Sequence, residues 1–295
     1  MKKNHLLFLA FIFSAMTVFG QGKDNSLLWK ISGNNLTKSS YLYGTFHLLC
    51  PADLNIKDKV KDAVEQSEQM VLELDFDDPS VMKTIQQNMA YTDGTTAKDY
   101  LDKSEYKLVA QFFRDSLNMP FERLNTIKPF FLSSITMLHF AGCQPVSFEQ
   151  KLTSIASKHG MEIRGLETVR EQLTFIENLP MKVQKKMLME NLKNYDSSKV
   201  MFDKMMGFYL NENLERLNAI SEKYLSEDYA DFKKDLLTDR NKAWIPEIRE
   251  LIKKKASFVA VGAAHLPGDQ GVIELLRRQG YTVEPVHQAP AMSGL

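Results

Sequence analysis

The sequence predicts an α/β fold in which the two ends of the chain build one mixed sheet and a large helical insertion caps it. Short apolar segments rich in aromatic and β-branched residues occur before residue 77 and after residue 256. Between them, from about 79 to 254, apolar residues recur mostly at helical spacing. Two of the strand-like segments, Tyr41–Leu48 and Phe258–Leu266, contain the same Gly-x-x-His sequence. We expect these two strands to lie in one sheet.

Residues 1–20 have the pattern of a signal peptide. Lys2 and Lys3 precede the apolar run Leu6–Phe19, and Gly20 completes a cleavage site before Gln21. The run is shorter than the roughly 20 residues of a spanning helix, and no other stretch approaches that length. We therefore expect an exported protein, periplasmic or secreted, with no transmembrane span in the mature chain. An uncleaved N-terminal anchor is the alternative.

Residues 21–295 are expected to form a single domain, which starts with sheet. Leu27–Ser32 and Ser40–Phe46 are strand-like and flank a Gly-Asn-Asn turn, so they predict a hairpin. Asn55–Glu68 has apolar residues on one helical face, and Met70–Phe76 is a short strand of buried type. A strand, a helix and a strand in this order favour parallel pairing through a right-handed crossover.

The insertion is predicted to be helical with one return to the sheet. Ser147–His159 is an amphipathic helix with Gly160 as its C-cap, and Glu162–Leu166 is again strand-like. From about 169 to 254 the pattern is helical, interrupted by Pro180 and Pro246.

The C-terminal part returns to the sheet. Ser257–Ala264 is a strand, Asp269–Gln279 a helix and Tyr281–Val286 a last strand.

Charge and cysteine content limit the class of protein. The chain has 37 basic and 37 acidic residues, a balance that gives no support to nucleic-acid binding. Cys50 and Cys143 are the only cysteines. Export favours a disulfide between them, with two buried thiols as the alternative.

His47 and His265, which end the two similar strands, are the leading site candidates. Open α/β sheets bind ligands at the carboxyl ends of their strands, where both histidines are expected. The glycine three residues before each histidine allows a close, side-chain-free approach. Imidazole is a common metal ligand and titrates near neutral pH. A metal or acid–base site is therefore favoured over two structural histidines.

Four further residues are candidates for chemistry. Glu73 lies in an apolar strand, where a carboxylate needs a metal or an ion-pair partner. Glu167 ends another strand, just before a helix start that resembles a capping box. Arg240 can stabilise an oxyanion and Asn241 can donate to it, although such residues are also ordinary at a helix start.

Taken together, these segments resemble the TraB/GumN family, whose distant relatives include the Tiki membrane proteases, erythromycin esterases and the haem-binding ChaN group. Each motif alone is weak, but five in this order over nearly the whole mature chain are fairly specific. The resemblance implies an α/β fold in which both histidines and the glutamate after the second strand converge. Pro246, which should interrupt the helix begun by Arg240-Asn241, departs from many relatives. The matching motifs are Tyr41-Leu-Tyr-Gly-Thr-Phe-His47, Leu72-Glu73-Leu-Asp75, Gly165-Leu-Glu167-Thr168 with Gln172, Arg240-Asn241 and Val261-Gly-Ala-Ala-His265.

Residues and resemblance together lead to a first hypothesis, a peptidase-like, metal-dependent hydrolase acting on a peptide or small-molecule substrate. His47, Glu73 and His265 would hold a divalent ion, Zn²⁺, Mn²⁺ or Co²⁺, and leave one position for water. Glu167 would act as general base, Arg240 would stabilise the oxyanion and Asn241 would orient the substrate. The sequence does not decide which of Glu73 and Glu167 is the ligand and which the base.

Two other functions use the same residues. In one, the histidines face haem or another small ligand and the protein binds without catalysis. In the other, the protein is a metal-free esterase in which one histidine activates water and Glu73 orients it. The sequence leaves the substrate and the oligomeric state open.

Overall fold

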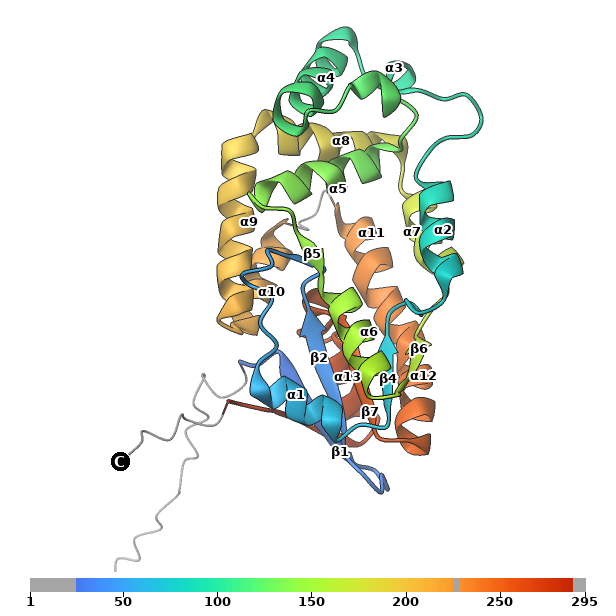
Figure 1. The fold of residues 1–295 in the computed structure, drawn as a ribbon, viewed down its shortest axis with the longest axis vertical. Helices are drawn as coiled ribbons and strands as arrows, with labels where there is room; N and C mark the ends of the chain where they lie inside the picture. Colours follow the sequence, from blue (N-terminus) through green and yellow to red (C-terminus); the bar gives the residue numbers. More distant parts are fainter. Residues whose placement is uncertain (1–24, 225–228, 289–295) are drawn as a thin grey trace, which may run out of the picture.

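The strand-like segments at both ends of the chain form one six-stranded mixed sheet, as the sequence predicts (Figure 1). The computed structural model describes residues 25–224 and 229–288, so the expected signal peptide, residues 1–20, lies outside the described residues. The strand order is β6-β4-β7-β2-β1-β8. The strands are β1 (Leu28–Gly33), β2 (Ser40–Thr45), β4 (Gln69–Leu72), β6 (Glu162–Gly165), β7 (Ser257–Gly262) and β8 (Tyr281–Pro285).

The two Gly-x-x-His strands are direct neighbours. β2 and β7 pair in parallel, with Gly44 opposite Val261 and Thr45 opposite Gly262. β4 pairs in parallel with β7 and β6, whereas β1 runs antiparallel to β2 and β8. The carboxyl ends of β2, β7, β4 and β6 therefore meet at one edge of the sheet.

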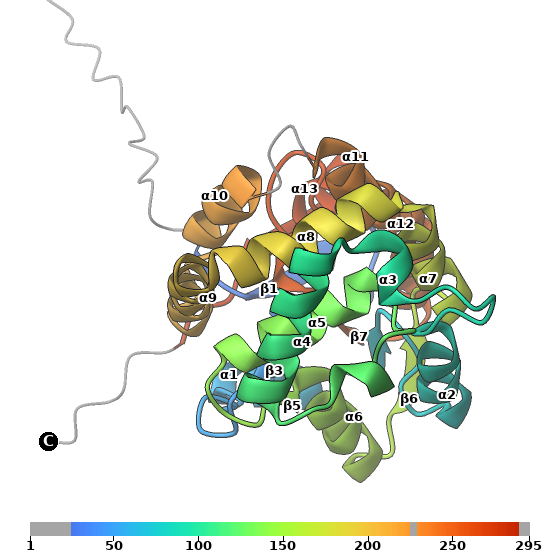
Figure 2. The same cartoon turned by 90° about the horizontal axis from the view of Figure 1, so that it is seen from above.

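Helices cover both faces of the sheet. Seen from above, α1 (Asp58–Glu65) and α6 (Phe148–Lys158) lie on one side, and α12 (Arg240–Lys254) and α13 (Val272–Arg278) on the other (Figure 2). Every residue of β2, β4 and β7 is buried between these layers. Because helices cover both faces of the sheet, the sequences of these strands are mainly apolar and do not alternate between apolar and polar residues.

The insertion arches over the carboxyl edge of the sheet (Figure 1). α5 (Pro129–Phe140) and α8 (Met181–Lys193) pack together as the roof, α9 (Tyr195–Leu210) descends on one side, and α7 (Val169–Asn178) lies on the other. The arch has its own apolar cluster, which includes Phe113, Phe121 and Leu132, apart from the core around the sheet. The remaining helices are α2 (Pro79–Asn88), α3 (Ala97–Tyr100), α4 (Lys103–Leu117), α10 (Leu214–Tyr224) and α11 (Ala230–Lys233).

A short second sheet ties the exit of β2 to the start of α6. β3 (Leu48–Leu49) pairs antiparallel with β5 (Val146–Ser147). Beside this pair, Cys50 and Cys143 form a disulfide with their Cα atoms 5.9 Å apart. The disulfide expected from the sequence is therefore present.

Several predicted ends shift by a few residues; the helix predicted as Asn55–Glu68, for example, is Asp58–Glu65. The two strands of the first strand-helix-strand unit, β2 and β4, are parallel but not paired with each other, because β7 lies between them.

Two further predictions also differ from the structure. The strand predicted as Met70–Phe76 ends at Leu72, because the backbone N–H of Gly262 ties the Glu73 side chain to the end of the neighbouring strand. Glu73 thus lies just beyond a strand end rather than within a strand.

The predicted interruption at Pro246 is also wrong, since α12 continues through this residue. Proline removes the N–H that would bond to the carbonyl of Lys242. Both residues lie on the exposed face, where water can reach that carbonyl. The opposite face buries residues that hold the helix on the protein, among them Trp244 and Ile248.

In the part of the chain that the structure describes, no helix has the length and apolar character needed to cross a bilayer.

Candidate functional site

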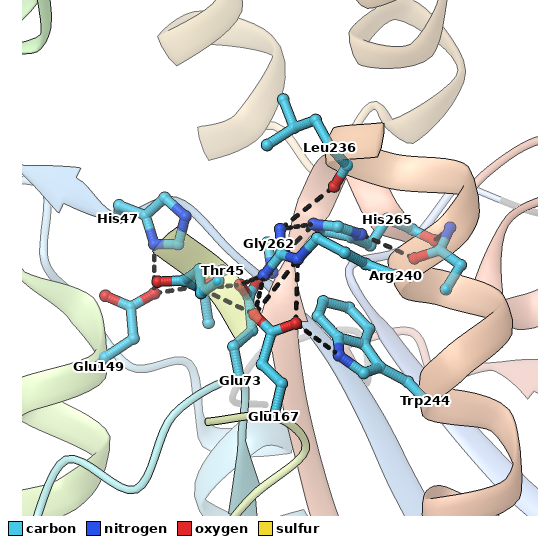
Figure 3. A network of polar contacts seen from close by, with 12 residues as sticks. Thr45, His47, Glu73, Glu149, Glu167, Leu236, Arg240, Trp244, Gly262 and His265 are labelled. Atoms are coloured by element: carbon cyan, nitrogen blue, oxygen red, sulfur yellow. Dashed lines mark hydrogen bonds and ion pairs between the residues drawn. The ribbon is translucent and has the colours of Figure 1, made fainter. Parts of the chain in front are cut away.

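All six predicted site residues come together at the carboxyl edge of the parallel strands. Five of them are seen in Figure 3, and the sixth, Asn241, hydrogen-bonds to His265. His47 follows β2, Glu73 follows β4 and Glu167 follows β6. His265 ends the 3₁₀ turn Ala263–His265 after β7. Arg240 and Asn241 begin α12, directly after the π-helix Lys234–Asp239, and reach the site from the side.

His265 is buried, and its neighbours fix its tautomer. Asn241 donates its Nδ2 hydrogens to the carbonyls of His265, at 3.3 Å, and Gln270, at 2.8 Å. Its Oδ1 therefore faces Nδ1 of His265, at 2.7 Å, and accepts a hydrogen bond from the Nδ1–H group. Burial lowers the pKa of His265 to about 3, so the ring is neutral and Nε2 carries a lone pair.

Glu73 is a buried carboxylate that stays ionised. Its Oε1 accepts the backbone N–H of Gly262 at 2.7 Å and lies 3.9 Å from Nε2 of His265. Burial alone would raise the pKa of Glu73, but His265, Arg240 and His47 outweigh it and lower the pKa to about 2. Because His265 is itself neutral, the guanidinium of Arg240 is the main charge behind this effect.

Arg240 links the two buried carboxylates. Its Nη2 lies 2.6 Å from Oε2 of Glu73 and 2.6 Å from Oε1 of Glu167. Its Nη1 donates to Nε2 of His265 at 3.2 Å. Glu167 also accepts hydrogen bonds from Trp244, at 3.2 Å, and Gln172, at 3.0 Å. Two carboxylates share one guanidinium, so this cluster has negative charge in excess.

His47 differs from His265 in nearly every respect. Its side chain is 64 % exposed, and Nδ1 lies 2.9 Å from Oε1 of Glu149. The protein around the ring would by itself lower the pKa of His47, but the carboxylate of Glu149 overcomes this and raises it to about 9. His47 is therefore protonated at neutral pH, with Nδ1 donating to Glu149.

Glu149 is the site residue that the sequence did not reveal. It lies in the first turn of α6, its side chain is only 7 % exposed, and it also accepts from the hydroxyls of Thr45 and Ser147. A glutamate two residues after a serine N-cap is typical of any helix start. Only its pairing with a residue 102 positions away sets it apart, and no local pattern contains that information.

The side chains of His47, His265 and Glu73 surround one space above Gly262. A Cβ atom on this glycine would lie 3.4 Å from Oε1 of Glu73, 3.4 Å from Cδ2 of His265 and 3.7 Å from Nε2 of His47. These contacts are of van der Waals length, so a methyl group would fill the space without clash. The absent side chain leaves three groups facing a common point.

The donor types at this space are those that the divalent ion expected from the sequence would need. Two imidazole nitrogens and a carboxylate oxygen suit Zn²⁺, Mn²⁺ or Co²⁺. Nδ1 of each ring is held by a separate partner, Glu149 or Asn241, as is usual for metal-binding histidines. As they stand, no three His, Cys, Asp or Glu side chains among residues 25–224 and 229–288 are spaced to enclose an ion. The Nε2 of His265 would first have to be released by Arg240.

Comparisons with known proteins agree with the resemblance seen in the motifs. The sequence pattern of the TraB/PrgY/gumN family matches residues 27–285. Searches of curated proteins and of solved structures gave no match. The matched region runs from just before β1 to the end of β8 and contains all the site residues described above. The chain therefore belongs to the TraB/PrgY/gumN family.

Proposed function

We propose that this protein is a metal-dependent hydrolase that cleaves peptide-like substrates at the edge formed by β2, β7 and β4. One observation carries the proposal: His47, His265 and Glu73 converge above Gly262 while Nδ1 of each ring is occupied elsewhere. The negative charge left by two carboxylates sharing one guanidinium favours a bound cation.

In this proposal His47, His265 and Glu73 would hold the ion, which would supply polarisation of the scissile carbonyl and a lower pKa for water. Glu73 is chosen over Glu167 as the ligand because it lies 3.9 Å from Nε2 of His265. Asn241 fixes the tautomer of His265 and thus acts on that ring rather than on the substrate.

Arg240 controls which lone pairs at the site are available. Its guanidinium donates to His265, Glu73 and Glu167 at once. A cation bound at the site would repel the guanidinium and so release Nε2 of His265 before any substrate arrives. The same shift would free an oxygen of Glu167, which this residue needs in order to act as the proposed general base. The N–H groups of Arg240 could then donate to a substrate oxyanion.

The surroundings suit the side chains of a peptide. Phe46, next to His47, packs edge-on against Phe202 of α9, with ring centroids 6.1 Å apart. On the opposite side the Arg240 guanidinium lies 5.7 Å from the ring of Phe175, which contacts Phe130 of the roof. Aromatic rings on both sides of the charged site would suit apolar groups that flank a polar scissile bond.

Export remains part of the proposal. The Cys50–Cys143 disulfide supports it, because disulfides form and persist mainly in oxidising compartments.

The test is metal content together with hydrolysis. We expect His47→Ala and His265→Ala to lose bound Zn²⁺, Mn²⁺ or Co²⁺ in elemental analysis and to lose cleavage of a fluorogenic peptide library. His159→Ala is the control, because His159 bonds to the carbonyl of Ile155 at the exposed end of α6, outside the site. Unchanged metal content in both site variants would refute the proposal.

A second candidate is a metal-free hydrolase based on the pair His47–Glu149. It is favoured by the contact of Arg240 with His265, which occupies a proposed metal-binding nitrogen. The sequence hypothesis gave the orienting role to Glu73, whereas Nδ1 of His47 pairs with Glu149 in the structure. His47 acts as a base only when neutral, so this activity should rise with pH up to about 9 and survive exhaustive chelation. Loss of activity on chelation rejects this candidate.

A further inference from the structure

We propose that Glu149 is a positioning residue for His47, and that the β3–β5 pair with the Cys50–Cys143 disulfide forms a clamp that keeps the two together. The consequence for metal affinity rests on the proposed function, in which His47 is a ligand. The orientation of the ring does not rest on it, so the two can be tested apart.

His47 needs such a restraint because the fold around it provides little else. β2 ends at Thr45, two residues earlier, and the His47 side chain is 64 % exposed. Within the described part of the chain, the only hydrogen bond to its ring is the one with Glu149. A ring that is free to rotate about χ1 and χ2 would present Nε2 to the space above Gly262 only part of the time.

Glu149, in contrast, is held in place. Oε1 accepts the hydroxyl of Thr45 at 2.9 Å, and Oε2 accepts the hydroxyl of Ser147 at 3.0 Å. The carboxylate also lies in the first turn of α6, where the helix dipole favours a negative charge. Because a carboxylate only accepts, Nδ1 of His47 keeps its hydrogen when the ring loses a proton, and Nε2 is then the free nitrogen on the side of the site.

The clamp holds the backbone at His47 close to the backbone at Glu149. The N–H of Phe148, next to Glu149, donates to the carbonyl of His47 at 3.2 Å. β3 follows His47 directly and pairs with β5, which directly precedes Phe148. The disulfide then joins Cys50, just after β3, to Cys143, shortly before β5. Two chain segments that are far apart in sequence are thus joined within a few residues of the His47–Glu149 contact.

The experiment compares Glu149→Gln and Glu149→Asp with Glu105→Gln. Gln keeps the length of the side chain and removes its charge, whereas Asp keeps the charge but is one methylene too short to reach His47. Glu105 is the matched control, a mostly buried carboxylate in the first turn of α4 that pairs with Lys185 away from the site. Each full-length protein is titrated with Co²⁺, and the imidazole Nδ1–H signal of His47 is followed by NMR in the metal-free protein. That signal is assigned by its absence from His47→Gln.

A positioning role predicts a loss of about 10- to 100-fold in Co²⁺ affinity in both Glu149 variants, once the affinities are corrected for the proton that His47 must release in each protein. It also predicts a weakened or missing Nδ1–H signal in both, and neither effect in Glu105→Gln. If Glu149 only stabilises the start of α6, Glu149→Asp should match the wild type in both measurements, and the inference is overturned. If the wild type binds no Co²⁺, Zn²⁺ or Mn²⁺, the proposed function fails, and the NMR signal alone decides the role of Glu149.

The clamp is tested with the double variant Cys50→Ser/Cys143→Ser. We expect the Nδ1–H signal of His47 to broaden and Co²⁺ affinity to fall in the direction seen for Glu149→Gln. A double variant that loses thermal stability but keeps both the signal and the affinity would show that the disulfide serves the fold alone.

Discussion

Two histidines in matching sequence motifs have opposite states because their neighbours differ. Near His47 the nearest charge is the carboxylate of Glu149, which raises the pKa of the ring to about 9. His265 is buried beside Trp244 and faces the guanidinium of Arg240, and its pKa falls to about 3. Binding an ion would therefore require a proton to leave His47, but none to leave His265.

Gly262 provides a test at the scale of one residue. Its backbone angles, φ −52° and ψ 136°, suit any residue, and a Cβ would make only van der Waals contacts. Gly262→Ala should therefore fold normally but fill the space between His47, His265 and Glu73. We expect at least a tenfold loss of Co²⁺ affinity with little change in melting temperature.

The control for this substitution is Gly207→Ala in α9, where a Cβ would meet nothing within 4 Å. It should leave metal affinity unchanged and stabilise the helix by roughly 0.5–1 kcal/mol. Equal Co²⁺ affinity in Gly262→Ala and the wild type would mean that the ion does not bind above Gly262.

At the scale of secondary-structure elements, the site depends on strand ends and on one side helix. Parallel pairing of β2, β7, β4 and β6 brings His47, His265, Glu73 and Glu167 to one edge. α12 then adds Arg240 and Asn241, and its buried face fixes their position against the sheet. The orientation of α12 is thus as important for the site as the strands themselves.

Pro246 tests how firmly α12 is held. Proline in a helix interior costs about 3 kcal/mol relative to alanine, partly offset by roughly 0.4–1 kcal/mol from the stiffer unfolded chain. Pro246→Ala restores the hydrogen bond to the carbonyl of Lys242 and should stabilise the protein by roughly 2 kcal/mol in urea unfolding. Hydrolysis should stay unchanged, because the exposed Pro246 lies away from the site. A loss of stability would mean that α12 needs the proline for its present course.

At the scale of the whole molecule, the ionised groups of the site predict how stability depends on pH. The pKa of His47 is raised from 6.5 to about 9, so its stabilising effect is complete below pH 6.5 and disappears as the pH rises through 9. The pKa of His265 is lowered from 6.5 to about 3, so the unfolded chain takes up the extra proton and stability falls below pH 6.5. The pKa of Glu73, lowered from 4.5 to about 2, adds to this loss below pH 4.5.

We therefore expect the metal-free protein to be most stable near pH 6.5. Urea unfolding across the pH range measures this curve. In His47→Gln the free energy of unfolding should change less between pH 6.5 and 9 than in the wild type. In His159→Gln, a change outside the site, it should fall over this range as in the wild type. An alkaline limb that is unchanged in His47→Gln would show that the ion pair with Glu149 does not stabilise the fold.

The sequence predicted the architecture well because the relevant signals are local. Apolar runs and the repeated Gly-x-x-His motif predicted that β2 and β7 lie in one sheet, and the structure adds that they are parallel neighbours. All six proposed site residues do meet. Contacts between residues that are far apart in the sequence could not be predicted from local patterns. Nothing near Glu149 identifies His47 as its partner, and nothing near Glu73 shows that its strand stops at Leu72. The helix interruption was wrongly predicted at Pro246 because the sequence shows the cost of a proline in a helix. It does not show that burial of one face of α12 against the protein offsets this cost.

The position of β1 has a consequence for how the molecule is made. This strand forms a hairpin with β2, whereas its other edge pairs with β8 and the other edge of β2 pairs with β7. The hairpin therefore stays without its outer partners until the chain has been made to about residue 285. His47 and His265 are brought together only once β7 has joined β2.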